Sequence, residues 1–148
     1  MNSTKFEKEY HADFNKDGET EGWFKTNGDL VVKDGICSTK FLGIDGGVRR
    51  KFDVDLTQYK IHFEFRMRIS SAVKLSVFAF HALGTEQDDK VYLTNNGSGD
   101  WQTFTGTWTP TTARQLTEIW INLIAAEDAT GNSQEFDFIN IDLERKKI

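Results

Sequence analysis

The most constraining feature of the sequence is the stretch Tyr59–Ile69, where apolar and polar residues alternate without a break. Side chains of a β-strand point to opposite faces with this period of two, whereas at helical spacing the same residues would scatter around the whole surface. The stretch therefore predicts a half-buried strand. Its polar face is either ordinary solvated surface or one wall of a site that binds something polar. The polar positions are His62, Glu64, Arg66 and Arg68.

The rest of the chain is typical of short strands joined by tight turns, since it holds 12 glycines, one proline and 13% aromatic residues. Asn27-Gly28 and Asp34-Gly35 predict two hairpins. No long stretch has a helical period, although Thr112–Leu116 could form one turn. About ten strands with such turn signals between them indicate an all-β antiparallel sandwich or barrel, as one domain over residues 1–148. The expected strands are Phe6–Phe14, Gly22–Lys25, Leu30–Lys33, Ile36–Leu42, Val48–Val54, Tyr59–Ile69, Lys74–Leu83, Lys90–Thr94, Trp101–Trp108, Leu116–Ala126 and Glu135–Leu143.

Charge and cysteine usage exclude several classes of protein. With 18 Lys and Arg against 23 Asp and Glu the net charge is −5, which argues against nucleic acid as the main partner. The longest apolar stretches have the length of strands, so no membrane-spanning helix is expected. The single cysteine, Cys37, excludes an internal disulfide and is predicted to be a buried, inert thiol. Because the first residues lack an apolar signal core, we expect either an intracellular protein or a part of a longer secreted chain.

Three segments together resemble a known family. Asp13–Trp23, Gly99–Trp108 and Phe136–Leu143 are similar, in order and spacing, to segments of calcium-carrying jelly-roll carbohydrate-binding modules such as those of families 4, 9 and 22. The resemblance implies a jelly-roll β-sandwich that binds a polysaccharide, of β-glucan or xylan type, on the concave face of one sheet. It also implies a non-catalytic accessory domain of a larger secreted or cell-surface protein. A structural or interaction domain without sugar affinity is the alternative, because the scaffold serves both roles.

The resemblance places Trp120 and Asn122, on the penultimate strand, in the sugar-binding groove. The alternation of residues 119–123 agrees, since Ile119, Ile121 and Leu123 would face the core. An aromatic ring covers the C–H face of a sugar, and planar polar side chains pair with its hydroxyl groups. His62, Glu64 and Arg66 would join this groove if their strand faced the same side. In the alternative interpretation, Trp120 caps a secondary core and Arg66 pairs with Glu64 at the surface.

Other aromatic residues are weaker candidates for sugar contacts. Phe41 is the only aromatic residue in the loop where the family carries its second aromatic platform. Tyr92 and Trp101 are further candidates, although Trp101 is expected to pack in the core, as is Trp23.

Asp13, Asn15 and Asp17 are spaced like the start of a helix–loop–helix calcium site. Such a loop needs a bidentate Glu at its twelfth position, which is Phe24 here, so that type of site is excluded. The resemblance instead implies a structural calcium ion held by Asp13, Asn15, Asp17 and Asp142. An ordinary acidic turn is the alternative.

No catalytic constellation stands out. Glu135–Asn140 is similar to the E-x-D-x-x-E motif of jelly-roll glucanases, but Asn140 replaces the third carboxylate. The three histidines lack zinc-ligand spacing, and there is no nucleophile elbow, phosphate loop or dinucleotide fingerprint. We therefore expect a protein that is not an enzyme, with a jelly-roll hydrolase or lyase as the least favoured alternative.

Overall fold

A computed structural model of the chain describes residues 6–26, 29–84, 88–93, 98–109 and 115–146. Within these ranges eleven strands pair antiparallel in two sheets, and none of the residues is helical. The expected all-β antiparallel sandwich of about ten strands is confirmed. No helix that could cross a membrane occurs in the described part of the chain.

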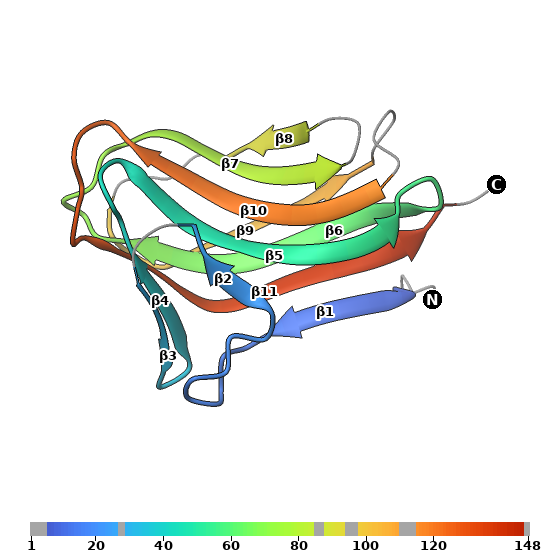
Figure 1. The fold of residues 1–148 in the computed structure, drawn as a ribbon, viewed down its shortest axis with the longest axis horizontal. Coiled ribbons are helices and arrows are strands. Elements are labelled where there is room, and N and C mark those ends of the chain that lie inside the picture. Colours follow the sequence, from blue (N-terminus) through green and yellow to red (C-terminus); the bar gives the residue numbers. More distant parts are fainter. Residues whose placement is uncertain (1–5, 27–28, 85–87, 94–97, 110–114, 147–148) are drawn as a thin grey trace.

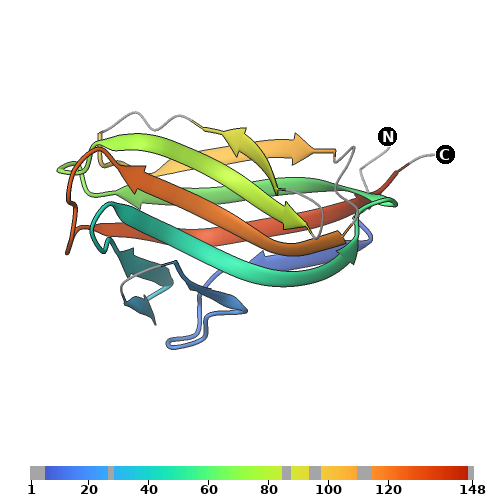
Figure 2. The same cartoon turned by 45° about the horizontal axis from the view of Figure 1, so that its top comes forward.

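The two sheets are stacked face to face as two layers (Figures 1 and 2). The six-stranded sheet has the order β3-β4-β11-β6-β9, and β1 also pairs with β11; the five-stranded sheet has the order β2-β5-β10-β7-β8. In the six-stranded sheet the strands are β1 (Lys8–Ala12), β3 (Leu30–Lys33), β4 (Ile36–Lys40), β6 (Tyr59–Ile69), β9 (Gln102–Trp108) and β11 (Ser133–Arg145). In the five-stranded sheet they are β2 (Trp23–Lys25), β5 (Asp45–Asp55), β7 (Leu75–Gly84), β8 (Asp88–Tyr92) and β10 (Gln115–Ala125).

The core lies between the sheets and is rich in phenylalanine. Strand β6 has the bounds that its alternation predicts, and all its apolar alternate residues are buried. Phe63 of β6 stacks on Phe80 of β7, with ring centroids 4.2 Å apart and planes at 13°. This stack joins the two sheets, and within the six-stranded sheet the ring of Phe65 lies 5.3 Å from that of Phe104 of β9. Ile119, Ile121 and Leu123 of β10 are fully buried, as predicted.

One of the two predicted hairpins forms and the other does not. Asp34 and Gly35 both have positive φ values, 54° and 77°, and join β3 to β4 in a tight turn. Residues 27–28, which hold the Asn-Gly signal, lie outside the described residues, but the flanking strands are not partners: β2 pairs with β5 and β3 pairs with β4. This hairpin prediction is wrong, because β2 and β3 belong to different sheets.

Three smaller predictions can also be compared with the structure. Cys37 is buried, and burial raises the pKa of its thiol to about 12, which suits the predicted inert role. Trp23 is buried in the core, as expected. The helical turn predicted at Thr112–Leu116 falls mainly outside the described residues, and its last two residues belong to β10.

A glycine sets the close approach of the two central strands of the five-stranded sheet. Gly47 of β5 lies opposite Asn122 of β10 and has a φ of 114°, a value that L-residues rarely adopt. A Cβ atom at this position would overlap the main-chain carbonyl oxygen of Ile121. The β5–β10 pairing therefore depends on the absence of a side chain here.

We predict that Gly47→Ala destabilises the protein strongly. The control is Gly131→Ala, which also changes a glycine of positive φ, 88°, but has open space around its Cβ position. Gly131→Ala should cost about 1–2 kcal/mol of unfolding free energy, and Gly47→Ala clearly more. Urea unfolding measures both values. Equal losses would show that β5 and β10 adapt to a side chain at position 47.

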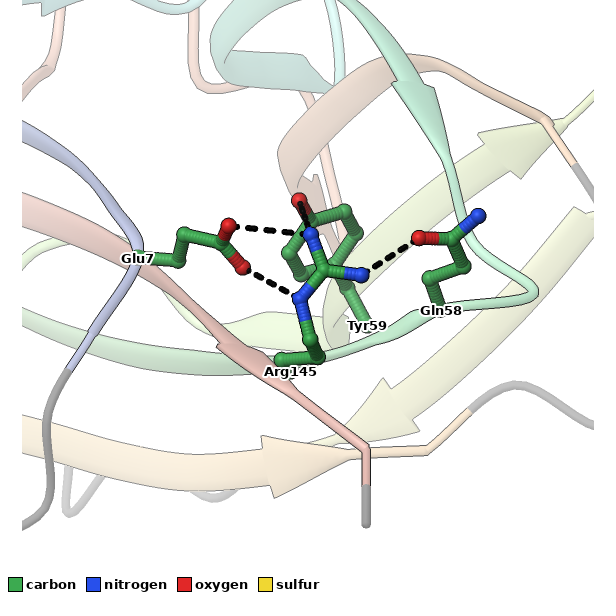
Figure 3. A network of polar contacts seen from close by, with 4 residues as sticks. All are labelled: Glu7, Gln58, Tyr59 and Arg145. Carbon is green, nitrogen blue, oxygen red and sulfur yellow. Dashed lines mark hydrogen bonds and ion pairs between the residues drawn. The ribbon is translucent and has the colours of Figure 1, made fainter. Parts of the chain in front are cut away.

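The ends of the described chain are joined by one arginine (Figure 3). The guanidinium of Arg145, at the end of β11, donates two hydrogen bonds to Glu7, from Nε to Oε2 at 2.7 Å and from Nη2 to Oε1 at 2.9 Å. It also donates to Gln58 and to the hydroxyl of Tyr59. The hydrogen bond from Arg145 lowers the pKa of the Glu7 carboxyl. The segment that precedes β1 is thus bonded to both β11 and β6.

The lowered pKa of Glu7 predicts a pH-dependent contribution to stability. A carboxyl with a lowered pKa in the folded state stabilises the fold above its unfolded pKa, and this contribution is lost as the pH falls through the folded pKa. We expect Glu7→Gln to lower the thermal midpoint slightly at pH 7, and the difference from the natural protein to vanish in acid. Glu9→Gln, two residues further along the chain, is the control. A Glu7→Gln difference that persists at low pH would contradict this account.

Candidate functional site

The structure divides the predicted sugar-binding residues between two opposite surfaces. His62, Glu64 and Arg66 lie on β6 in the six-stranded sheet, whereas Trp120 and Asn122 lie on β10 in the five-stranded sheet. Both sets point away from the shared core, so the two sets face opposite sides of the sandwich. The prediction that all five line one groove is wrong. Alternation shows which side chains leave the core, but it does not show to which sheet a strand belongs.

Phe41 also differs from the prediction. Only 1% of it is exposed, and its ring packs beneath Gly46 in the core. A ring that is fully buried cannot stack on a sugar at the surface, so the assignment of Phe41 to the binding site is wrong.

Trp120 lies half-buried on the outer face of the five-stranded sheet. The guanidinium carbon of Arg49, from β5, lies 3.5 Å from the centroid of its ring, which is the distance of a close cation–π stack. The indole Nε1 donates a hydrogen bond of 3.3 Å to Oε1 of Glu118, two residues earlier on the same strand. The ring is therefore held in one orientation by its neighbours on the sheet.

The register of three neighbouring strands, β2, β5 and β10, places Trp120 at one end of a row of side chains. Phe24 of β2 is opposite Arg49 of β5, and Arg49 is opposite Trp120 of β10. Neighbouring strands are about 4.8 Å apart, so the row is about 10 Å long. Asn122 lies on the same face, opposite Gly47. The outer face therefore presents two aromatic rings with a guanidinium between them.

Two residues of this row, Phe24 and Arg49, are not among those predicted from the sequence. Phe24 follows the core residue Trp23 in a strand of three residues, so its outward direction could have been inferred from the burial expected of Trp23. Arg49 stands in the run Arg49-Arg50-Lys51, which shows no alternation. Only the register of β5 shows that Arg49 and Lys51 point outward while Arg50 is opposite the buried Ile119.

A cavity adjoins the Phe24 end of the row. Its volume is about 530 Å³, and it lies between β2 and β3 at the edge of the sandwich. Phe24, Leu30 and Val31 give it an apolar part, and Lys25 and Asp29 are the charged residues that line it. A volume of this size lies within the range of ordinary ligand sites.

The outer face of the six-stranded sheet has a different character, because its charged groups pair with one another. His62 Nε2 lies 2.6 Å from Glu144, Arg68 Nε lies 2.6 Å from Glu135, and Arg66 lies 3.5 Å from Asp137. Arg66 therefore does not pair with Glu64 as the alternative interpretation proposed, and Glu64 is exposed opposite Asn140.

Trp101 lies on this second face and not in the core. It is half-buried, and its ring lies 4.7 Å from the guanidinium of Arg68 and 5.1 Å from that of Arg66. The expectation that Trp101 packs in the core is wrong. For Tyr92, pairing with Ala79 assigns the residue to β8 in the five-stranded sheet.

Glu135 and Asp137, which resembled part of a glucanase motif, are also on β11 in this face. Each pairs with an arginine of β6, the neighbouring strand in the same sheet. A retaining hydrolase needs two carboxyl groups about 5–5.5 Å apart on either side of the bond that it cleaves. Glu135 and Asp137 instead form ion pairs with arginines of the neighbouring strand, and such pairs do not provide this arrangement.

The four residues predicted to bind calcium do not gather. Asp13 accepts two hydrogen bonds from Asn15, the Asp17 carboxylate accepts one from the main-chain NH of Asp34, and Asp142 Oδ1 lies 2.6 Å from His11 Nε2. In the part of the chain that the structure describes, no three His, Cys, Asp or Glu side chains are placed to hold a metal ion.

A cavity with acidic side chains beside β1 also fits a cation poorly. It has a volume of about 430 Å³ and is lined by His11 and by three carboxylates, those of Glu9, Glu19 and Glu21, but also by the half-buried Arg50. The fixed positive charge of a guanidinium disfavours a calcium ion beside it. Calcium binding stays a prediction from the resemblance, and in the part of the chain that the structure describes these residues are not arranged to hold the ion.

Comparisons with known proteins identify the fold. No protein-family model and no curated protein matches the sequence. Among solved structures, the N-terminal cellulose-binding domain of β-1,4-glucanase C from Cellulomonas fimi matches with a TM-score of 0.60 and 14% identity, over 94% of this chain and 96% of that domain. The low-affinity xylan-binding module of family 86 from Roseburia intestinalis gives a TM-score of 0.56 and 13% identity, over 94% and 95%.

A glycosyl hydrolase family protein from Mycobacterium fortuitum also matches, with a TM-score of 0.51 and 8% identity, over 93% of this chain and 99% of that one. Identities this low establish the fold alone. The chain has the jelly-roll fold of carbohydrate-binding modules, as the sequence resemblance implied.

The calcium expectation is tested by chelation. Because Asp13 and Asp142 already have partners within the protein, we expect EDTA to leave the thermal midpoint unchanged. A midpoint that falls with EDTA and recovers with added calcium would show that an ion does stabilise the fold. Magnesium in place of calcium is the control for a general effect of divalent ions.

Proposed function

We propose that the chain is a non-catalytic carbohydrate-binding module that binds a polysaccharide, of β-glucan or xylan type, across the outer face of its five-stranded sheet. The observation that carries the proposal is the row of Phe24, Arg49 and Trp120, with Asn122 beside it. Aromatic rings suit the C–H faces of sugars, and amide and guanidinium groups suit their hydroxyls.

The length of the row supports a chain-like ligand. About 10 Å across three strands matches about two sugar rings laid perpendicular to the strands. The cavity beside Phe24 would give a further contact to a chain that continues beyond the β2 edge. The matching structures support the ligand class, since one is described as a cellulose-binding domain and another as a xylan-binding module.

The binding role implies a larger protein. Modules of this kind hold a catalytic domain close to its insoluble substrate, so we propose that the chain acts as an accessory domain of a secreted or cell-surface protein. Its partners would be the polysaccharide and the catalytic or anchoring parts of that protein. In the proposal, Trp120 and Arg49 make the main contacts and Asn122 and Phe24 extend them.

A structural or interaction domain on the same fold is the second candidate. One observation favours it: Arg49 covers part of the Trp120 ring, as it would in a surface cluster that only stabilises the sheet. The two candidates differ in what the loss of Trp120 should do.

We expect Trp120→Ala to abolish retardation in native gels that contain the bound polysaccharide, with a small change in thermal midpoint because the ring lies on the outer face. The gels would contain β-glucan, xylan, mannan, galactan or no polymer. Trp101→Ala removes the same side chain from the opposite face and should leave retardation intact.

Two results would contradict the proposal. Free migration of the natural protein in every gel would favour the structural domain. A large loss of stability in Trp120→Ala, with binding retained by the folded fraction, would make Trp120 a structural residue.

A further inference from the structure

Arg49 differs from the arginines of the opposite face in having no acidic partner. Arg66 pairs with Asp137 and Arg68 with Glu135. Arg49 instead contacts the Trp120 ring and donates a hydrogen bond of 3.3 Å from Nε to the hydroxyl of Thr26. Of the carboxylates in the described chain, none lies within ion-pair distance of Arg49. Within the described residues, its positive charge therefore has no ion-pair partner.

The way in which Arg49 is held leaves its recognition groups available. A guanidinium is planar and carries five N–H donors in its plane. Stacking on Trp120 uses the flat face, and the bond to Thr26 uses only Nε. The terminal nitrogens keep donors in the plane, and this arrangement fits both oxygens of one carboxylate. Because the group is already stacked, little side-chain freedom is lost when an anion binds.

The surrounding charges do not oppose an anion at this point. Lys51, two residues further along β5, points to the same face and is exposed. Glu118 is the nearby acidic residue, and its Oε1 accepts the indole N–H of Trp120. Asp45 and Asp53 are each four residues from Arg49 along β5, about 13 Å away. Among the described side chains at the middle of β5 and β10, two positive charges therefore stand against one negative charge, although the whole chain has a charge of −5.

We infer that the five-stranded face selects an acidic polysaccharide, one whose sugars carry carboxylates, with Arg49 as the residue that binds the carboxylate. The inference rests on the proposed function and narrows it to a class of ligand. The sugar ring packs beside Trp120, and the carboxylate accepts two hydrogen bonds from the terminal nitrogens of Arg49. A neutral glucan or xylan would bind the same row without this contact.

The test compares one polymer with and without its carboxylates. Glucuronoxylan and the same glucuronoxylan after chemical reduction of its carboxyl groups differ only in that charge. Isothermal titration calorimetry should give the natural protein an affinity about tenfold higher for the acidic form, the scale expected of a hydrogen-bonded charge pair. In Arg49→Met, which can still pack on Trp120, the two affinities should become nearly equal.

Two further variants separate charge from geometry. Arg49→Lys keeps the charge but loses the planar pair of donors, so most of the preference should disappear. Arg66→Met removes one positive charge from the opposite face and should keep the full preference. Thermal midpoints show whether each variant is folded.

The outcomes distinguish the inference from the proposed function. If the natural protein binds both forms equally, or binds only neutral glucan or mannan, Arg49 does not select carboxylates and the inference is wrong. The proposed function as a carbohydrate-binding module would still be supported. If Arg49→Met keeps the preference, another group recognises the anion and the inference is wrong. If no polysaccharide binds at all, both the proposed function and the inference fail.

Discussion

The packing of aromatic rings between the two sheets determines the rest of the structure. Phe63 on Phe80, with Phe65 against Phe104, buries the inner faces of strands from both layers. Once these rings are inside, the period of two forces every intervening side chain outward. Trp120 is outside because Ile119 and Ile121 are inside, and Phe24 is outside because Trp23 is inside. The candidate site is thus a consequence of the core, and a slip of one residue in β10 would bury it.

The charged side chains of the two outer faces differ in their partners. On the six-stranded face, histidine and arginine side chains pair with carboxylates of β11, and Trp101 lies beside two arginines that already have acidic partners. Exposed pairs of this kind add little stability, but they leave few unpaired groups for a ligand. On the five-stranded face, Arg49 is stacked on Trp120 without an acidic partner in the described part of the chain. This contrast is the reason for placing the ligand on the five-stranded face.

Much of the fold could be predicted from the sequence, because strand patterns and tight turns are local. The bounds of β6, the Asp34-Gly35 turn and the buried positions of β10 all follow from neighbouring residues. The sheet to which a strand belongs does not follow from neighbouring residues. β2 and β3 are close in sequence but lie in different sheets, and β6 and β10 also lie in different sheets. For that reason Trp120 and Asn122 were predicted correctly to point outward, while His62, Glu64 and Arg66 were joined to them wrongly. Arg49 could not be found, since its run of three basic residues shows no alternation.

The central claim, that the five-stranded face binds the polysaccharide, is tested most directly by the indole N–H signals of the four tryptophans. A ¹H–¹⁵N spectrum would be recorded during titration with glucuronoxylan oligosaccharides, and the signals would be assigned by single Trp→Phe variants. The account predicts that the Trp120 signal shifts with saturation, while those of Trp101 on the opposite face and of Trp23 in the core stay in place. A shift of Trp101 with an unmoved Trp120 would place the ligand on the six-stranded sheet and contradict the account.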